Sequence, residues 1–254
     1  MRAHTSVAKT TALLFAALIA GSSSLTAQQA SSSSVSGEGD ASRDESTSRW
    51  SVSARAGALA YGTQGNLFGM VKRELTLGRS DFVAAAGGVD VMFRVGRPLD
   101  LFVSGDWSRV NASSTARGTT VTSANQDTSL ESYPAVYGGL HLRLRDSAQP
   151  SNKWGLGLLA GLGQVRYRLE QTGVFPDAFD RPDVITHNYA SANTAMIGVV
   201  GLVIDRHLGD SWAFVVDSRY RRATAGLNGD YAAFDEIDLS GLQFSAGLRL
   251  RIGR

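Results

Sequence analysis

From residue 50 onward, the chain repeats segments in which apolar and polar side chains alternate one by one. Strict alternation is typical of a β-strand that turns one face to an apolar environment and the other to a polar one. The second segment places Val89, Val91 and Phe93 opposite Asp90 and Arg94. Eight segments of this kind predict eight strands: 50–61, 82–95, 99–110, 133–145, 153–170, 189–205, 211–222 and 237–252.

The fifth segment changes phase in its middle. Up to Leu162 the large apolar residues occupy even positions, and from Val165 onward they occupy odd positions. A slip of one residue beside a glycine predicts a β-bulge near Gly163.

The links between these segments alternate in length. The long links are 62–81, 111–132, 171–188 and 223–236, and the short links are 96–98, 146–152 and 206–210. Alternating short and long links predict an all-β, eight-stranded, antiparallel up-and-down transmembrane β-barrel of a bacterial outer membrane. A ten-stranded barrel would need residues 66–77 to pair as an extra hairpin, and we expect a short loop element there instead.

The N-terminus has the three parts of a secretory signal peptide. Arg2 and Lys9 supply positive charge, residues 11–20 are apolar, and Ala27 supplies the small residue at a cleavage site. We therefore expect residues 1–27 to be a signal peptide. Residues 28–49 hold one apolar residue larger than alanine, and we expect a disordered periplasmic tail because they cannot bury enough surface to fold.

Removal of the signal peptide changes the charge balance. The full chain has 25 Lys+Arg and 23 Asp+Glu, and both basic residues of the signal peptide leave with it, so the mature chain is formally neutral. This balance gives no reason to expect nucleic acid as a partner. The chain has no cysteine, which excludes a disulfide framework and a cysteine lipid anchor.

Aromatic residues gather at the ends of the predicted strands, as at the two interfaces of a membrane barrel. Trp50, Trp154 and Trp212 begin odd-numbered strands, so we expect them at the periplasmic interface. At the opposite interface we expect Tyr61, Phe82, Trp107, Tyr133, Tyr167, Tyr189 and Tyr220.

Alternation alone does not decide which face points inward. A soluble lipocalin-like binding barrel would hold its apolar face inside, around a ligand. The membrane barrel is favoured because the apolar faces are long enough for the roughly 9–11 residues that a tilted membrane strand needs. Asp and Arg also recur at mid-strand on the polar faces, as expected of paired charges inside a lumen.

In strand number, order of links and aromatic positions, residues 50–254 resemble the superfamily of eight-stranded outer-membrane barrels that includes the OmpA transmembrane domain, OmpX and OmpW. The resemblance implies a monomer in the outer membrane that contacts lipids and lipopolysaccharide and is inserted by the barrel-assembly machinery. One departure is the C-terminus, where Ile252 is in phase but the terminal aromatic residue usual in that superfamily is missing.

The polar faces predict a charge network in the lumen. An eight-stranded barrel is just wide enough to be filled by side chains, and charges there must be paired. A plug of Arg–carboxylate pairs is the favoured interpretation, and a narrow, weakly anion-preferring channel is the alternative. The expected members are Arg55, Asp90, Arg94, Asp106, His141, Arg143, Arg166, Arg168, Glu170, Asp205, Asp217, Arg219, Arg221, Arg249 and Arg251.

No pattern of residues predicts an enzyme, a metal site or a cofactor site. His141 with Ser104 and Asp106 on the neighbouring strand could suggest a catalytic triad, but an inward histidine among Asp and Ser is more often a hydrogen-bonded lumen residue. We therefore expect a structural or surface-interaction role through the long extracellular loops. A small channel for ions or small solutes and a soluble binding barrel remain the alternatives.

Overall fold

A computed structural model describes residues 49–116, 125–145, 153–176, 184–209 and 211–252. The expected signal peptide and all of the expected tail except Arg49 lie outside these residues. Among the described residues, no helix is long and apolar enough to cross a membrane.

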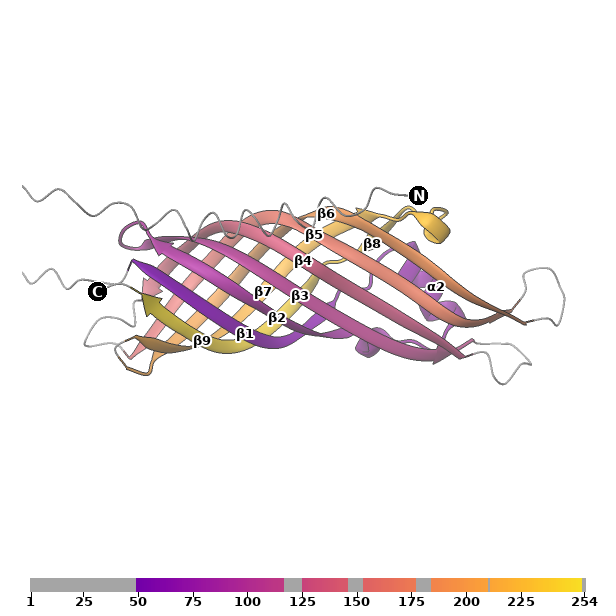
Figure 1. Cartoon of the computed structure of the whole chain (residues 1–254), viewed down its shortest axis with the longest axis horizontal. Coiled ribbons are helices and arrows are strands. Elements are labelled where there is room, and N and C mark those ends of the chain that lie inside the picture. The colour runs from indigo at the N-terminus through magenta and orange to yellow at the C-terminus, as the bar shows by residue number, and fades with distance from the viewer. Residues whose placement is uncertain (1–48, 117–124, 146–152, 177–183, 210, 253–254) are drawn as a thin grey trace, which may run out of the picture. The chain divides into compact units, whose positions relative to one another are not determined.

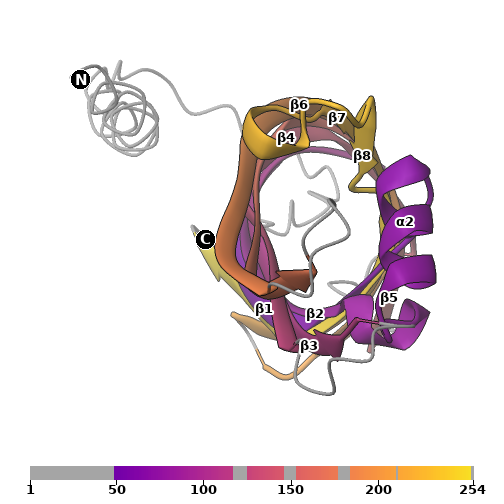
Figure 2. The same cartoon turned by 90° about the vertical axis from the view of Figure 1, so that its right-hand side faces the viewer.

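Eight antiparallel strands form a closed ring (Figures 1 and 2). In ring order they are β1 (Trp50–Tyr61), β2 (Val83–Arg94), β3 (Leu99–Thr115), β4 (Asn125–Arg145), β5 (Trp154–Pro176), β6 (Val184–His207), β7 (Trp212–Gly226) and β9 (Gly241–Ile252). Each strand pairs with the next along the chain, and β9 closes the ring by pairing with both β7 and β1. The predicted eight-stranded up-and-down barrel is confirmed.

The two ends of the barrel differ. At the end that we call the base, Trp50 of β1 lies opposite Ile252 of β9, and the links of β2 to β3 and of β6 to β7 are short. At the opposite end, the top, β3 to β6 run well beyond the short strands β1, β2 and β9 (Figure 1). Two of the predicted long links are thus partly strand, because β3 and β4 pair as far as Thr115 and Asn125, and β5 and β6 as far as Pro176 and Val184.

The phase change near Gly163 is not a bulge. The pairing of β5 with β6 is continuous from Trp154 to Pro176, and the odd positions of β5 face the lumen from Gly155 to Gln171. The environment changes instead: Leu158 and Leu162 face outward below Gly163, whereas Val165 and Leu169 face inward above it. The register shifts in the pairing of β4 with β5 lie in β4, between Ser132 and Ala135 and between Arg143 and Arg145.

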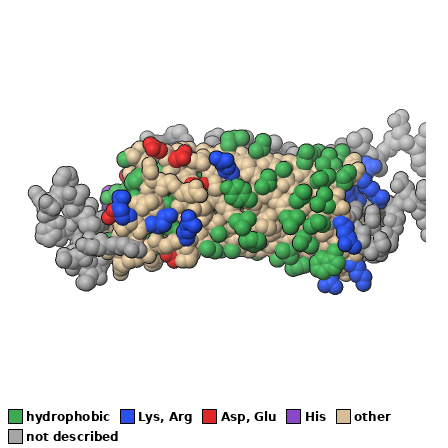
Figure 3. All heavy atoms as spheres, turned by 180° about the vertical axis from the view of Figure 1, so that it is seen from behind, with side chains coloured by type: hydrophobic (Ala, Val, Ile, Leu, Met, Phe, Trp, Pro, Cys, Tyr) green, Lys and Arg blue, Asp and Glu red, His purple; other side chains and the backbone are tan. Residues whose placement is uncertain are grey.

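The barrel therefore has two zones of opposite polarity. In the zone nearer the base, the outer surface is apolar, and in Figure 3 it forms the green band on the side away from the top. Nearer the top, the outer surface is polar and charged, while the interior is mostly apolar and also holds Gln126, Thr128 and Gln171. Large apolar residues exposed on the outer surface include Val89, Leu101, Val103, Leu140, Leu142, Leu158, Leu162, Val200, Leu202, Phe214, Phe244 and Leu248.

The segment between β1 and β2 closes the gap in the barrel wall near the top, where the short strands β1, β2 and β9 end. It contains the helix α2 (Asn66–Glu74) and the short 3-10 helix η1 (Arg79–Phe82), which confirms a loop element rather than an extra hairpin. Phe68 of α2 packs edge-on against Phe82 with ring centroids 5.1 Å apart. Past α2, Leu75 forms a bridge to Ala116 just beyond β3, which covers the free edge of that long strand.

On the other side of this wall, the edge of β7 beyond Arg221 is paired by the short strand β8 (Glu236–Asp238). Figure 2 shows α2 standing beside β8 at the top. The 3-10 helix η2 (Gly229–Tyr231) precedes β8 and lies on β6, where Asp230 accepts a hydrogen bond from the backbone N–H of Ala190. Together α2, η1, η2 and β8 form what we call the cap.

Candidate functional site

The lumen in the zone nearer the base holds most of the charged residues that the sequence predicted there. Eight of the predicted residues have buried side chains in this lumen, and Arg94, Arg143 and Arg251 are partly buried there. The eight are Arg55, Asp90, Asp106, His141, Asp217, Arg219, Arg221 and Arg249. Asp205 also points inward and is 9% exposed.

The middle of this lumen holds a compact ion cluster built around two arginines. Arg55 lies on β1 and Arg219 on β7, and Asp90 on β2 bridges them at 3.2 Å from Nε of Arg55 and 2.8 Å from Nη2 of Arg219. Asp217 lies 3.1 Å from Nη2 of Arg219, and Asp106 is paired with Arg55. All five side chains are at most 3% exposed.

Neutral groups complete the hydrogen bonding of this mid-lumen cluster. The hydroxyl of Tyr137 donates to Asp106 at 2.7 Å and accepts from Arg219 at 2.8 Å. Ser104 donates to Asp90 at 2.6 Å, and Ser245 donates to Asp217 at 2.6 Å. A buried charge is stable only when paired and hydrogen-bonded, and this cluster pairs every charge with bonds from six strands, leaving only Nε of Arg219 without a partner among the described residues.

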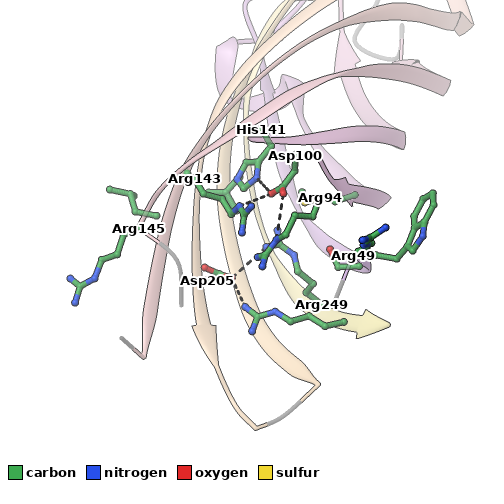
Figure 4. A pocket seen from close by; sticks show the side chains of 15 residues that line it. Arg49, Arg94, Asp100, His141, Arg143, Arg145, Asp205 and Arg249 are labelled. Carbon is green, nitrogen blue, oxygen red and sulfur yellow. Dashed lines mark hydrogen bonds and ion pairs between the residues drawn. The ribbon is translucent and has the colours of Figure 1, made fainter. Parts of the chain in front are cut away.

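A second charged cluster lies nearer the base (Figure 4). Asp100 accepts from Nδ1 of His141 at 3.0 Å and lies 3.1 Å from Nε of Arg143 and 3.9 Å from Nε of Arg94. Gly157 makes room for the imidazole, since a Cβ there would lie 2.2 Å from Nε2 of His141.

Across this base cluster, Asp205 lies 3.4 Å from Nη1 of Arg249 and 3.3 Å from Nη2 of Arg251. A cavity of about 40 Å³ lies among these side chains. Its lining includes both carboxylates and six arginines.

Arg221 lies above the mid-lumen cluster, toward the top. Its guanidinium stacks over the ring of Tyr61 at 5.1 Å from the centroid and donates to Ser108 at 3.2 Å. Tyr61 also bonds to Ser132 at 2.8 Å, which ties β1 to β4 across the lumen. Above this level the interior is apolar, with Leu130, Tyr167, Ile197 and Ile237 among its fully buried residues.

Three residues predicted for the lumen network lie elsewhere. Arg166 and Arg168 are exposed on the outer face of β5, and Glu170 beside them is partly exposed, with Arg168 Nε 2.9 Å from Oε1 of Glu170. The prediction was wrong because it assumed a bulge at Gly163. With continuous pairing, the even positions of β5 face outward throughout, and above the apolar band that side is polar.

Part of the predicted aromatic girdle was also misplaced. Trp50, Trp107, Trp154, Trp212, Tyr133 and Tyr220 are exposed on the outer surface. Tyr61, Tyr167 and Phe82 are buried inside, because β1 and β5 turn their odd positions to the lumen and Phe82 packs under α2. In Tyr167, the hydroxyl lies 3.0 Å from that of Ser191 and donates to the carbonyl of Gly226.

The residues of the suggested triad are not arranged as one. His141 contacts Asp100, whereas Ser104 contacts Asp90 and also donates to Asp106 at 3.2 Å. The sequence prediction missed Asp100, although it occupies the inward phase of β3 four residues before Ser104. That inward phase is the signal that could have identified it.

No protein-family model matches the chain, and no curated protein matches it. Several solved structures are similar to the chain. Ail, the attachment invasion locus protein of Yersinia pestis, is 13% identical with a TM-score of 0.40, covering 81% of this chain and 99% of Ail. The outer membrane protein OprG of Pseudomonas aeruginosa is 10% identical with a TM-score of 0.42, covering 82% of this chain and 98% of OprG.

The outer membrane protease OmpT of Escherichia coli is 11% identical with a TM-score of 0.38, covering 83% of this chain and 98% of OmpT. The chain is thus similar to each of these solved structures at low identity and over most of its length. Because the TM-scores are below 0.5, no ligand, partner or activity of these proteins is assigned to this chain.

Proposed function

We propose that this chain is a closed, non-enzymatic and monomeric β-barrel of the bacterial outer membrane that acts through its surface above the membrane. The observation that supports this most is the burial of the mid-lumen cluster. Arg55 and Arg219 are only 1–2% exposed and are held by carboxylates on several strands. A conducting pore would need these side chains to face water, as in barrels with an aqueous channel.

The outer surface supports a membrane location. A continuous apolar surface on all eight strands, flanked by outward tryptophans such as Trp50 and Trp154 near the base, is what a lipid bilayer requires. A soluble lipocalin-like barrel would hold the apolar face inside at this level, where Arg55 and Asp90 lie instead. In this proposal, residues 1–27 are the export signal, residues 28–49 are a periplasmic tail, and the base faces the periplasm.

The proposed working surface is the polar zone above the apolar band. Arg109 of β3 lies opposite Glu131 of β4, and Glu131 lies opposite Arg168 of β5, so charged side chains form a row around the outer face. Arg166 and Arg222 face outward in the same zone. Arginines at this height are suited to the phosphates of lipopolysaccharide and other outer-membrane lipids, which we propose as partners, with the barrel-assembly machinery acting during insertion.

Two measurements test the proposal. In fractionated cells, we expect the protein in the outer membrane, extracted only by detergent, with a gel mobility that shifts on boiling. Release without detergent would overturn the membrane location. In planar bilayers, we expect no step conductance from the intact protein, and we expect conductance from the D90A/R219A double variant, which removes the central pair. Steady conductance of the intact protein with anion preference would establish the channel alternative.

A further inference from the structure

The apolar outer surface of the barrel contains a groove. Its floor is made by small residues that face outward on three neighbouring strands: Gly138 of β4, Ala160 of β5 and Gly198 of β6. The groove has a volume of about 570 Å³, within the roughly 300–1,000 Å³ that is usual for ligand sites. The barrel wall is therefore hollowed on its outer side, where the other strands carry larger apolar side chains.

The register of four strands sets the shape of this groove. Leu162 of β5 lies opposite Gly138 on one side and opposite Gly198 on the other. Because neither glycine has a side chain to cover it, Leu162 protrudes from the wall and is 71% exposed. Gly198 lies in turn opposite Arg222 of β7. The groove thus has depth on both sides of Leu162 and reaches a guanidinium at β7.

Arg222 is the charged residue of the groove lining. It is exposed, and its side chain makes no hydrogen bond or ion pair within the part of the chain that the structure describes. None of the lining residues is acidic. The groove therefore combines an apolar floor with one positive charge that is available to an anion.

The groove lies at the upper limit of the apolar surface. On β5, Leu162 is followed on the outward face by Gln164 and Arg166, and on β7 the exposed ring of Tyr220 is followed by Arg222. A change from aliphatic to tyrosine and arginine side chains is typical of the level at which lipid acyl chains meet their headgroups. An acyl chain in the groove would thus have its headgroup beside Arg222.

We propose that this groove binds one acyl chain of a phosphate-bearing lipid, with the lipid phosphate at Arg222. Glycine and alanine in the floor allow the chain to approach the backbone closely, and this packing drives association inside a membrane. Arginine binds phosphate through paired hydrogen bonds. The inference rests on the proposed function, in which the top of the barrel faces outward, so the lipid is the lipid A part of lipopolysaccharide.

A second copy of the barrel would fit this groove less well. Two copies inserted in the same direction would place their Arg222 side chains at the same height, and no carboxylate of the lining could neutralise them. Like charges brought together in an interface weaken association. A lipid phosphate instead supplies the negative charge that the groove lacks.

Gly198 and Gly105 provide a matched pair of variants. A Cβ at Gly198 would lie 3.6 Å from Leu162, an ordinary contact, and a Cβ at Gly105 would have no atom within 4 Å. Gly105 faces outward on β3 and is not part of the groove lining. Gly198→Leu therefore fills the groove, whereas Gly105→Leu adds the same side chain elsewhere on the outer surface.

Native mass spectrometry of the full mature protein in detergent, titrated with lipid A, measures the fraction of protein that carries lipid. We expect Gly198→Leu to weaken lipid A binding about tenfold, a loss typical of an overpacked site, and Gly105→Leu to leave it unchanged. We expect Arg222→Gln to weaken binding about fivefold, the contribution of one basic residue near a membrane surface. Dephosphorylated lipid A should bind the intact protein and Arg222→Gln equally.

Three results would overturn the proposal. Equal lipid A binding in Gly198→Leu and Gly105→Leu would remove the groove as the site, and equal weakening of both forms of lipid A in Arg222→Gln would remove the phosphate contact. A dimer that Gly198→Leu dissociates, with no lipid bound, would assign the groove to a second copy.

If Gly198→Leu does not fold, Leu162→Ala removes an exposed wall of the groove, and Leu158→Ala is its control on the same face of β5 outside the lining. Weaker lipid A binding in Leu162→Ala than in Leu158→Ala supports the site, and equal binding overturns it. The titration reports lipid binding in detergent, so its failure leaves the closed barrel and its membrane location unaffected, and those are tested by conductance and by cell fractionation.

Discussion

Arg219 and Asp90 lie 129 residues apart in the chain and meet in the centre of the lumen, with Nη2 of Arg219 2.8 Å from Oδ2 of Asp90. Two strands, β9 and β1, separate β7 from β2 in the ring, so this contact exists only when the barrel is closed. A charged pair that needs closure favours the closed ring over open sheets, because an open sheet would break this contact and leave each of the two charges with fewer partners.

Asp90→Asn is expected to destabilise the barrel strongly. It leaves Arg55 and Arg219 buried with less carboxylate than they need, and breaking a buried pair costs about 3–5 kcal/mol. Urea unfolding in lipid vesicles, followed by tryptophan fluorescence, measures the loss. The matched control is Asp127→Asn, whose exposed carboxylate accepts a hydrogen bond from Ser113 at 2.6 Å; this change should cost less than about 0.5 kcal/mol. Equal losses in both variants would contradict the buried cluster.

The change of polarity along β5 predicts that one substitution has different costs at two heights. Leu158→Arg places a charge in the middle of the apolar surface and should cost about 2–4 kcal/mol in vesicles. Thr172→Arg, on the same face of the same strand but above the apolar band, should cost less than about 0.5 kcal/mol. Urea unfolding of both variants in the same lipid checks this, and similar costs would show that the membrane reaches Thr172.

The sequence predicted the part of the barrel that lipid surrounds, and it failed above that part. An alternating pattern shows which residues share a face, but the surroundings of each face decide which one carries the apolar residues. Where lipid lies outside and charged groups lie inside, the apolar residues Leu158 and Leu162 point outward. Above the membrane, water lies outside, so the apolar residues Val165 and Leu169 occupy the inward-facing odd positions of β5 instead. A change of surroundings and a β-bulge produce the same one-residue shift in the hydrophobic pattern of a single strand. Only the register of pairing with the neighbouring strands distinguishes the two.

The inward charges were predictable one strand at a time, whereas their partners were not. Arg55, Asp90 and Arg219 each stand out as a charge within an apolar alternation. Which carboxylate meets which arginine depends on strand tilt and on the register of several strands, and these long-range quantities leave no local mark in the sequence. The cap was missed for a similar reason, since α2 is short and its position depends on the edge of β3 that β2 leaves unpaired and on β8, both distant in the sequence.

Phe68→Ala should detach α2 from the wall. Phe68 is 2% exposed and packs on Phe82, so its truncation should cost about 3–5 kcal/mol of local packing. We expect trypsin to cut after Lys72 and Arg73 at least tenfold faster, because a detached helix opens more often. Mass spectrometry of the fragments measures this rate. Asn66→Ala, an exposed change in the same helix, is the control and should leave the cleavage rate unchanged.

The cap should also weaken at high pH through Tyr231. Burial of this phenol raises its pKa, and the negative charge of Asp230 adds to the effect. The neutral hydroxyl donates to Gln171 at 2.9 Å, so the folded state retains the proton that the unfolded chain loses near pH 10. This stabilisation is complete below about pH 10 and is lost as the pH rises through the folded-state pKa. Between pH 8 and pH 11, the unfolding midpoint should fall more in the wild-type protein than in Tyr231→Phe. The control is Tyr220→Phe, which alters an exposed ring on the outer surface, and its unfolding midpoint should fall as much as that of the wild type. An equal fall of the midpoint in all three proteins would show that Tyr231 is not the cause.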